Sequence, residues 1–178
     1  LYNSVVPSNK YYQTAWRRSG TFPGGFLMDG GVHHVAALRL VLGEIVGVNA
    51  MVKQMRDDLP PADTLSATLE FERGMVGVYN ITYAGGSAWI NPMHVVGERG
   101  SLRVDHNLLE VTQDGAPLPV SYSENSGVND EIAAFADAIQ HGTPHHNSPE
   151  QALQDVAVIE AMLESARTGT RVTPKRFA

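Results

Sequence analysis

The sequence predicts an α+β fold, in which a large open β-sheet, mostly antiparallel or mixed, is covered on one face by helices. In a long middle segment, residues 45–112, apolar and polar residues alternate with a period of two. This alternation is typical of strands that are half-buried on one face. Residues 26–42 and 129–168 instead carry apolar side chains at helical spacing. Runs of strands followed by runs of helices indicate the α+β class.

The first long helix is expected between Gly25 and Gly43. Its apolar residues lie almost all round the helix, which predicts that it is buried. Gly43 is expected to end it, because glycine accepts a left-handed conformation without a Cβ penalty. Two glycines inside this helix, Gly30 and Gly31, cost roughly 1 kcal/mol each relative to alanine. We therefore expect another part of the chain to pack closely against the backbone there.

The strands are expected to be short and mostly joined by tight turns. Arg73-Gly74 is a turn signal that predicts an antiparallel hairpin. Between residues 46 and 123, six to eight strands are expected, which indicates a large antiparallel or mixed sheet. Their predicted ranges are 1–6, 46–52, 63–72, 75–84, 88–96, 101–104 and 108–112, with short additions at 120–123 and 171–173.

Two helices are expected to close the chain. The first opens at Asn129 and ends at Gly142. The second has Ser148 as its N-cap, with Gln151 completing a capping box, and ends at Gly169. We expect both helices to be core scaffolding without a chemical role.

The composition of the chain excludes several classes of protein. The chain has 178 residues, no cysteine and a formal net charge of −6. This length suits one well-cored domain, and the mild acidity argues against nucleic acid or an anionic membrane as the main partner. Without cysteine there is no disulfide, thiolate nucleophile or zinc–thiolate site. No apolar run reaches the roughly 20 residues of a membrane helix, and the N-terminus is not a signal peptide, so a cytoplasmic location is expected.

Asp29 and His33 are the candidate catalytic residues. They are four residues apart, so on a helix their side chains converge on one patch. An imidazole can exchange a proton near neutral pH, and the acid can orient the ring or accept a substrate hydroxyl. The alternative is that the two residues only charge and cap the start of the helix.

The segment before this helix, residues 9–18, is polar and aromatic and predicts a binding surface for a hydroxylated ligand. Aromatic walls and charged donors suit such a ligand, although the same residues also suit a plain surface loop. The candidate substrate-binding residues are Lys10, Tyr12, Trp16, Arg17 and, on the helix, His34.

We expect no metal site. The possible ligands are Asp29, His33, His34 and the pair His145-His146. A catalytic zinc takes three protein ligands, and adjacent histidines on a helix cannot easily aim at one ion.

The stretch WRRSGTFPGGFLMDGGVHHVAALRLVLGE resembles the signature of the C-terminal domain of the Gfo/Idh/MocA (glucose–fructose oxidoreductase/inositol dehydrogenase) family. In that family a Gly-Gly lead-in precedes Asp-x-x-x-His on a helix, followed by an apolar run that ends in Leu-Gly. Asp29 matches the Asp and His33 the His. The phrase GERGSLRVD resembles the family's Gly-x-x-Gly-x-Leu hairpin, and the resemblance covers nearly the whole chain.

The resemblance implies a dihydrodipicolinate-reductase-like C-terminal domain over residues 1–178, with substrate-binding, catalytic and oligomerisation roles. An N-terminal Rossmann domain would carry the G-x-G-x-x-G turn, which is absent from this chain, and would bind most of the NAD or NADP. The family's catalytic lysine, from a Glu-Lys-Pro motif, would also lie upstream. We therefore expect no cofactor-binding residues here and an inactive fragment.

The expected function is the substrate-binding half of a NAD(P)-dependent oxidoreductase that acts on a secondary alcohol of a sugar, polyol or related hydroxylated compound. The alternative is a non-catalytic sugar-binding or assembly module with the same fold. Apolar residues occur in both phases of the strands, as with Met51 opposite in phase to Val52. A second apolar face predicts a homo-oligomer formed through the sheet.

Overall fold

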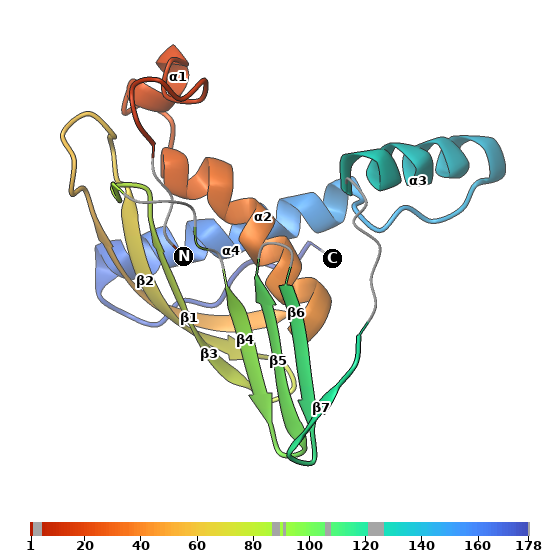
Figure 1. Ribbon diagram of the computed structural model, residues 1–178. Coiled ribbons are helices and arrows are strands. Elements are labelled where there is room, and N and C mark those ends of the chain that lie inside the picture. The colour runs from red at the N-terminus through yellow and green to blue at the C-terminus, as the bar shows by residue number, and fades with distance from the viewer. Residues whose placement is uncertain (2–4, 87–89, 91, 106–107, 121–126, 178) are drawn as a thin grey trace. The chain divides into compact units, whose positions relative to one another are not determined.

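The structure is a computed structural model that describes residues 1, 5–86, 90, 92–105, 108–120 and 127–177. The chain divides into two compact units, Leu1–Trp89 with Asn147–Ala178, and Ile90–His146. Figure 1 labels the helices and strands of both units.

The first unit is a three-stranded sheet with two long helices. Its elements are α1 (Ala15–Arg18), α2 (Phe26–Leu42), β1 (Ile45–Lys53), β2 (Thr64–Phe71), β3 (Val76–Thr82) and α4 (Pro149–Thr168). The strands run antiparallel in the order β1-β2-β3. Helix α4 packs on β1 and against α2, which also contacts β2. The edge strand expected at 171–173 is only an isolated bridge between Val48 and Val172.

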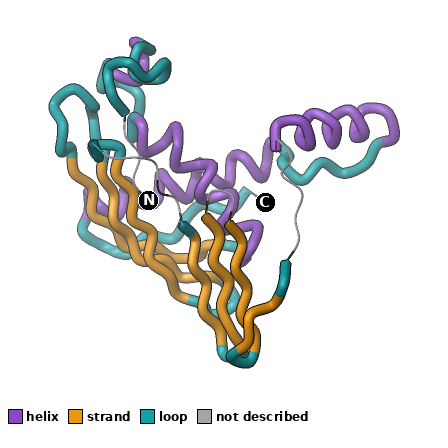
Figure 2. The backbone as a smooth tube through the Cα atoms, in the orientation of Figure 1, coloured by secondary structure: helices purple, strands orange, loops and turns teal. Residues whose placement is uncertain are grey.

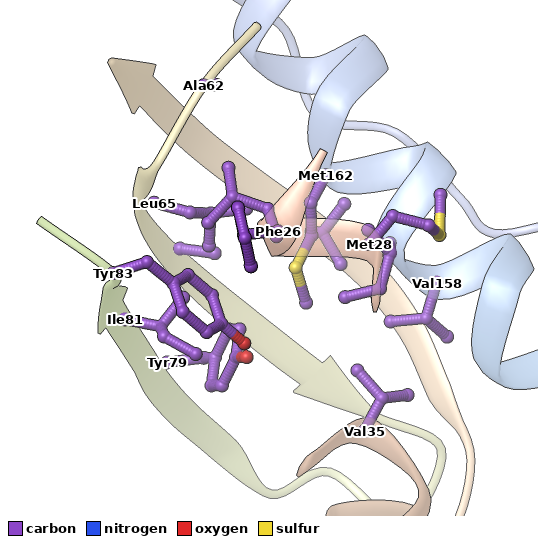
Figure 3. Close-up of a cluster of buried hydrophobic side chains, with 14 of the residues drawn as sticks. Phe26, Met28, Val35, Ala62, Leu65, Tyr79, Ile81, Tyr83, Val158 and Met162 are labelled. Carbon is purple, nitrogen blue, oxygen red and sulfur yellow. The ribbon is translucent and has the colours of Figure 1, made fainter. Parts of the chain in front are cut away.

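One face of this sheet forms the core with α2 and α4. Alternate residues of β2, such as Leu69 and Phe71, are buried, while Glu70 between them is exposed. The helices complete the core with fully buried side chains, including Val35 from α2 and Met162 from α4 (Figure 3). Each such side chain contributes about 1.5–3 kcal/mol through burial.

The second unit contains a four-stranded antiparallel meander and one helix. Its elements are β4 (Met93–Gly97), β5 (Gly100–Asp105), β6 (Leu108–Gln113), β7 (Ala116–Leu118) and α3 (Gly127–His141). The hairpin expected from GERGSLRVD is the β4–β5 pair, with Gly97 opposite Gly100.

The predicted α+β fold class is confirmed, with the described strands divided between two sheets rather than joined in one (Figure 2). Strand β7 was not predicted. Residues 2–4, 88, 89, 91 and 121–123 of the predicted strands lie outside the described residues. Of the predicted residues 1–6 and 120–123, the described Leu1, Val5, Val6 and Val120 lie in no strand.

The assignment of both closing helices to the core is wrong for α3. None of its residues is buried, and Ile132, Phe135 and Ile139 are between 58% and 70% exposed. Their helical spacing predicted a covered face, but no other described element of the second unit covers that stripe. Helix α4 does lie in the core.

Helix α2 is buried mainly along one stripe, so the expected burial on all sides is wrong at its C-terminal end. Leu40 is 82% exposed, whereas Arg39 is only 8% exposed. Gly43, with φ of 86°, follows the last helical residue as expected.

A buried charge network explains the position of Arg39. Its guanidinium donates to Glu44, to Asp155 and to the backbone and side-chain oxygens of Gln151. The Gln151 side-chain oxygen therefore accepts a hydrogen bond from Arg39 and does not complete the predicted capping box. The other half of that box is present, because Ser148 Oγ accepts a hydrogen bond from Gln151 N at 3.3 Å.

Candidate active site

A pocket of about 310 Å³ opens beside the N-terminal half of α2. Its polar lining comes from two segments, residues 9–17 and α2. The polar lining residues are Asn9, Tyr11, Arg17, Asp29, His33 and His34. Val5, Phe26, Gly30 and Tyr83 form the rest of the wall.

Helix α2 brings Asp29 and His33 to the same pocket, as their spacing of four residues predicted. His33 is exposed, and the part of the chain that the structure describes gives it no hydrogen-bond partner. Its ring nitrogens are therefore available to a ligand.

Arg17 binds Asp29 through two hydrogen bonds. Arg17 Nε donates to Asp29 Oδ2 at 2.7 Å, and Nη2 donates to Oδ1 at 3.0 Å. Nη1 donates to Thr14 Oγ1 at 2.9 Å. The guanidinium carbon also lies 4.1 Å from the centre of the Trp16 ring and 5.2 Å from that of Tyr11. We call Arg17 and Asp29 the clamp; such two-point pairs fix both position and orientation.

The clamp changes the expected role of Asp29. Both carboxylate oxygens accept hydrogen bonds from Arg17, and no hydrogen bond joins Asp29 to His33 among the described residues. The Asp29 side chain still faces the pocket and is 28% exposed. Its remaining lone pairs can accept a ligand hydroxyl, so it is a fixed acceptor rather than an orienting partner for the imidazole.

His34 lines the same pocket and is anchored to the sheet. Its Nδ1 lies 3.2 Å from the Tyr79 hydroxyl. Burial, followed by the neighbouring charge of His33, lowers the pKa of His34 to about 4. Tyr79 is 4% exposed, and burial raises its pKa well above the usual value. Both partners are therefore uncharged near neutral pH.

The two glycines of α2 allow the close approach that the sequence predicted. A Cβ atom on Gly30 would lie 1.8 Å from the Tyr83 hydroxyl. A Cβ atom on Gly31 would lie 2.9 Å from Ile159 Cδ1. Figure 3 shows the Tyr79 and Tyr83 rings entering the core from the same strand region, with their hydroxyl groups toward the same side.

Of the predicted site residues, the structure places Asp29, His33, His34 and Arg17 at the pocket, while Lys10, Tyr12 and Trp16 do not line it. Tyr12 is buried and donates to Asp58 Oδ2 at 2.9 Å. Trp16 packs edge-on against Phe22. The Lys10 ammonium lies 4.9 Å from the centre of the Tyr11 ring.

Sequence reasoning missed Asn9, Tyr11 and Tyr83. Tyr11 was adjacent to the chosen Tyr12, and no local pattern separates two neighbouring tyrosines in a loop. Tyr83 did carry a signal, because it continues the buried phase of Tyr79 and Ile81.

The glycine-rich lead-in packs closely against other parts of the chain. A Cβ atom on Gly24 would lie 2.9 Å from Leu163 Cδ1, and one on Gly25 would lie 2.8 Å from the Pro60 carbonyl oxygen. These two positions therefore leave no room for a side chain.

The described residues hold no candidate metal site and no candidate membrane span. They contain no group of three or more His, Asp or Glu residues placed to hold a metal ion. The described helices also include none long and apolar enough to cross a membrane.

The chain is similar to known dehydrogenases over most of its length. It is 30% identical to the dehydrogenase FPY6 of Fusarium mangiferae, covering 93% of this chain and 50% of that protein. It is 26% identical to D-xylose 1-dehydrogenase (NADP(+)) 2 of Haloferax volcanii, covering 84% and 48%. A solved oxidoreductase of Thermotoga maritima superposes with a TM-score of 0.82 at 34% identity, covering 97% and 51%.

The chain thus spans about half the length of the relatives it matches. The profile of the Gfo/Idh/MocA oxidoreductase family described as the C-terminal alpha/beta domain matches residues 1–173. With this match and the fold described above, the chain belongs to the Gfo/Idh/MocA oxidoreductase family and corresponds to its C-terminal α/β domain.

Proposed function

We propose that this chain is the substrate-binding half of a NAD(P)-dependent oxidoreductase that acts on a secondary alcohol of a sugar, polyol or related hydroxylated compound. The observation that carries the proposal is the pocket beside α2, into which both residues of the family's Asp-x-x-x-His motif project. The similarity to a xylose dehydrogenase named as NADP-linked supports a sugar substrate and a nicotinamide cofactor.

The pocket has the groups that alcohol oxidation requires of the protein. The hydroxyl must lose its proton while its carbon loses a hydride, so a proton acceptor must lie at the reacting oxygen. His33, exposed to the pocket on α2, is the candidate for hydrogen bonding that oxygen and for carrying its proton. Asp29, fixed by Arg17, is the candidate acceptor for a neighbouring hydroxyl. The cofactor, bound by another part of the protein, would supply the hydride acceptor.

The upstream lysine of the family remains a second candidate for the base. We place the protein in the cytoplasm, with no nucleic acid or membrane partner.

The test is turnover by the full-length protein with NAD or NADP across a panel of sugars and polyols. His33→Ala is expected to lower kcat/KM by about 10²-fold, the usual scale for a lost acid–base group. His94→Ala is the control, because His94 is exposed on β4, outside the pocket. If the folded parent protein binds sugars but oxidises none, the non-catalytic alternative is correct. If turnover by His33→Ala equals that of His94→Ala, the assigned role of His33 is wrong.

A further inference from the structure

We propose that the pocket selects a neutral polyhydroxylated substrate over a carboxylated or phosphorylated one, because Asp29 neutralises Arg17, its one permanent cation among the described residues. The inference rests on the proposed function, since it treats this pocket as the substrate site.

The geometry of the clamp leaves little of Arg17 for a ligand. Two of its nitrogens donate to Asp29 and the third donates to Thr14. Its side chain is 13% exposed, and the rings of Trp16 and Tyr11 lie against the guanidinium. A carboxylate or phosphate ligand could bind Arg17 only by breaking the clamp. It would then lie close to the negatively charged Asp29 carboxylate.

The N-terminus of α2 does not provide an alternative anion-binding site to Arg17. A helix N-terminus attracts negative charge, but here Asp29 already occupies the first turn. An anionic ligand near this turn would meet a fixed like charge, and such juxtapositions disfavour binding.

The other polar groups are suited to hydroxyls. His34 is held at the Tyr79 hydroxyl and is uncharged near neutral pH. Asn9 and Tyr11 add a neutral amide and a phenol group to the lining. Phe26 and the tyrosine rings provide apolar surface for the C–H groups of a sugar.

The experiment measures binding of matched ligand pairs to the full-length protein with NAD(P) present, by titration calorimetry. The pairs are D-glucose with D-glucuronate, and myo-inositol with its monophosphate. The neutral member is expected to bind at least about ten-fold more tightly in each pair. Equal or tighter binding of the anion overturns the inference, as does failure of both members of every pair to bind. Turnover is measured separately. A protein that binds the neutral ligands more tightly but oxidises none of them would refute the proposed function and leave the inference about ligand charge standing.

Three variants test the cause of the preference. Asp29→Asn leaves Arg17 unneutralised and is expected to shift the binding ratio toward the anion by about ten-fold or more. Arg17→Gln is expected to shift it further toward the neutral ligand. Glu70→Gln is the matched control, because Glu70 accepts two hydrogen bonds from Arg171 outside the pocket; it should leave the ratio unchanged. If Asp29→Asn and Arg17→Gln fold normally and leave the ratio at the parent value, the inference is wrong.

Discussion

His34 illustrates how burial can decide whether a residue is charged. Its pKa is lowered to about 4 chiefly because burial disfavours the imidazolium, and the charge of His33 adds to this effect. Its one hydrogen-bond partner among the described residues is the uncharged Tyr79 hydroxyl. A half-buried histidine without an acid beside it thus remains a neutral part of the pocket wall.

This shift predicts a pH-dependent stability. Because the pKa of His34 in the folded protein is below the ordinary 6.5, protonation favours the unfolded state. The stabilisation is complete above pH 6.5 and decreases as the pH falls toward 4. The melting temperature of the parent should therefore drop more steeply over this interval than that of His34→Gln. Parallel curves for parent and variant would refute the assignment; exposed His94→Gln is the control and should follow the parent.

At the scale of elements, the contact between α2 and the sheet depends on the absence of a side chain at Gly30. In an ordinary helix, Gly→Ala stabilises by about 1 kcal/mol. Here the new Cβ would lie 1.8 Å from the Tyr83 hydroxyl. Overpacking of this kind typically costs about 1–3 kcal/mol, so Gly30→Ala should lower the free energy of unfolding.

Gly127→Ala is the matched control for this prediction. Gly127 begins α3, and nothing lies within 4 Å of the position that its Cβ would take. Chemical denaturation should show a loss of stability for Gly30→Ala and none for Gly127→Ala. Equal effects of the two substitutions would mean that the close approach of Tyr83 does not constrain α2.

The network around Arg39 ties the end of α2 to α4. The side chains of Arg39 and Asp155 are 5% and 8% exposed, and Nη1 lies 2.5 Å from Oδ1. Burial raises the pKa of Asp155 even though the bond to Arg39 opposes that shift. The position of Asp155 in the core therefore depends on its cationic partner.

Removing that partner is expected to be costly. Arg39→Met leaves Asp155 buried without its cation, and such changes typically cost about 3–5 kcal/mol. The double variant Arg39→Met/Asp155→Leu should recover part of the loss, as measured by chemical denaturation. The exposed ion pair of Arg167 with Glu164 provides the control: Arg167→Met should change stability by less than about 1 kcal/mol. A double variant no more stable than Arg39→Met would contradict this account.

The predicted oligomer would form through the outer face of the β1–β2–β3 sheet. Met51, Val76 and Val78 alternate with buried or half-buried residues and are 69–81% exposed. These apolar side chains share their face with polar ones, including Thr68 opposite Val78. We propose that this face pairs with a second copy of the protein.

The oligomer prediction can be tested by mass in solution. The full-length protein should sediment as an oligomer at micromolar concentration. Val78→Lys should shift it toward the monomer, because a charge would be buried in the interface. Val96→Lys is the control: Val96 is a comparably exposed valine, 72%, on β4 in the other sheet. A monomeric parent protein would overturn the proposal.

Features that depend on neighbours along the chain could be predicted from the sequence. The period of two placed β1, β2 and β3, and Ser148 and Gly43 marked helix ends that the structure confirms. The spacing of Asp29 and His33 on one helix brought both to one pocket, because four residues make about one turn.

The tertiary structure decided the features that depend on contacts between distant segments. In the folded chain, Arg17 rather than His33 is the partner of Asp29. Tyr83, which follows β3, lies in the pocket wall. The tertiary structure buried Arg39 and exposed Leu40, against their hydropathy, because the acids that neutralise Arg39 come from α4 and from the residue before β1. The local pattern of apolar residues indicates which face of a helix or strand is buried. The partner of a charged side chain can come from a distant segment, so only the folded structure identifies it.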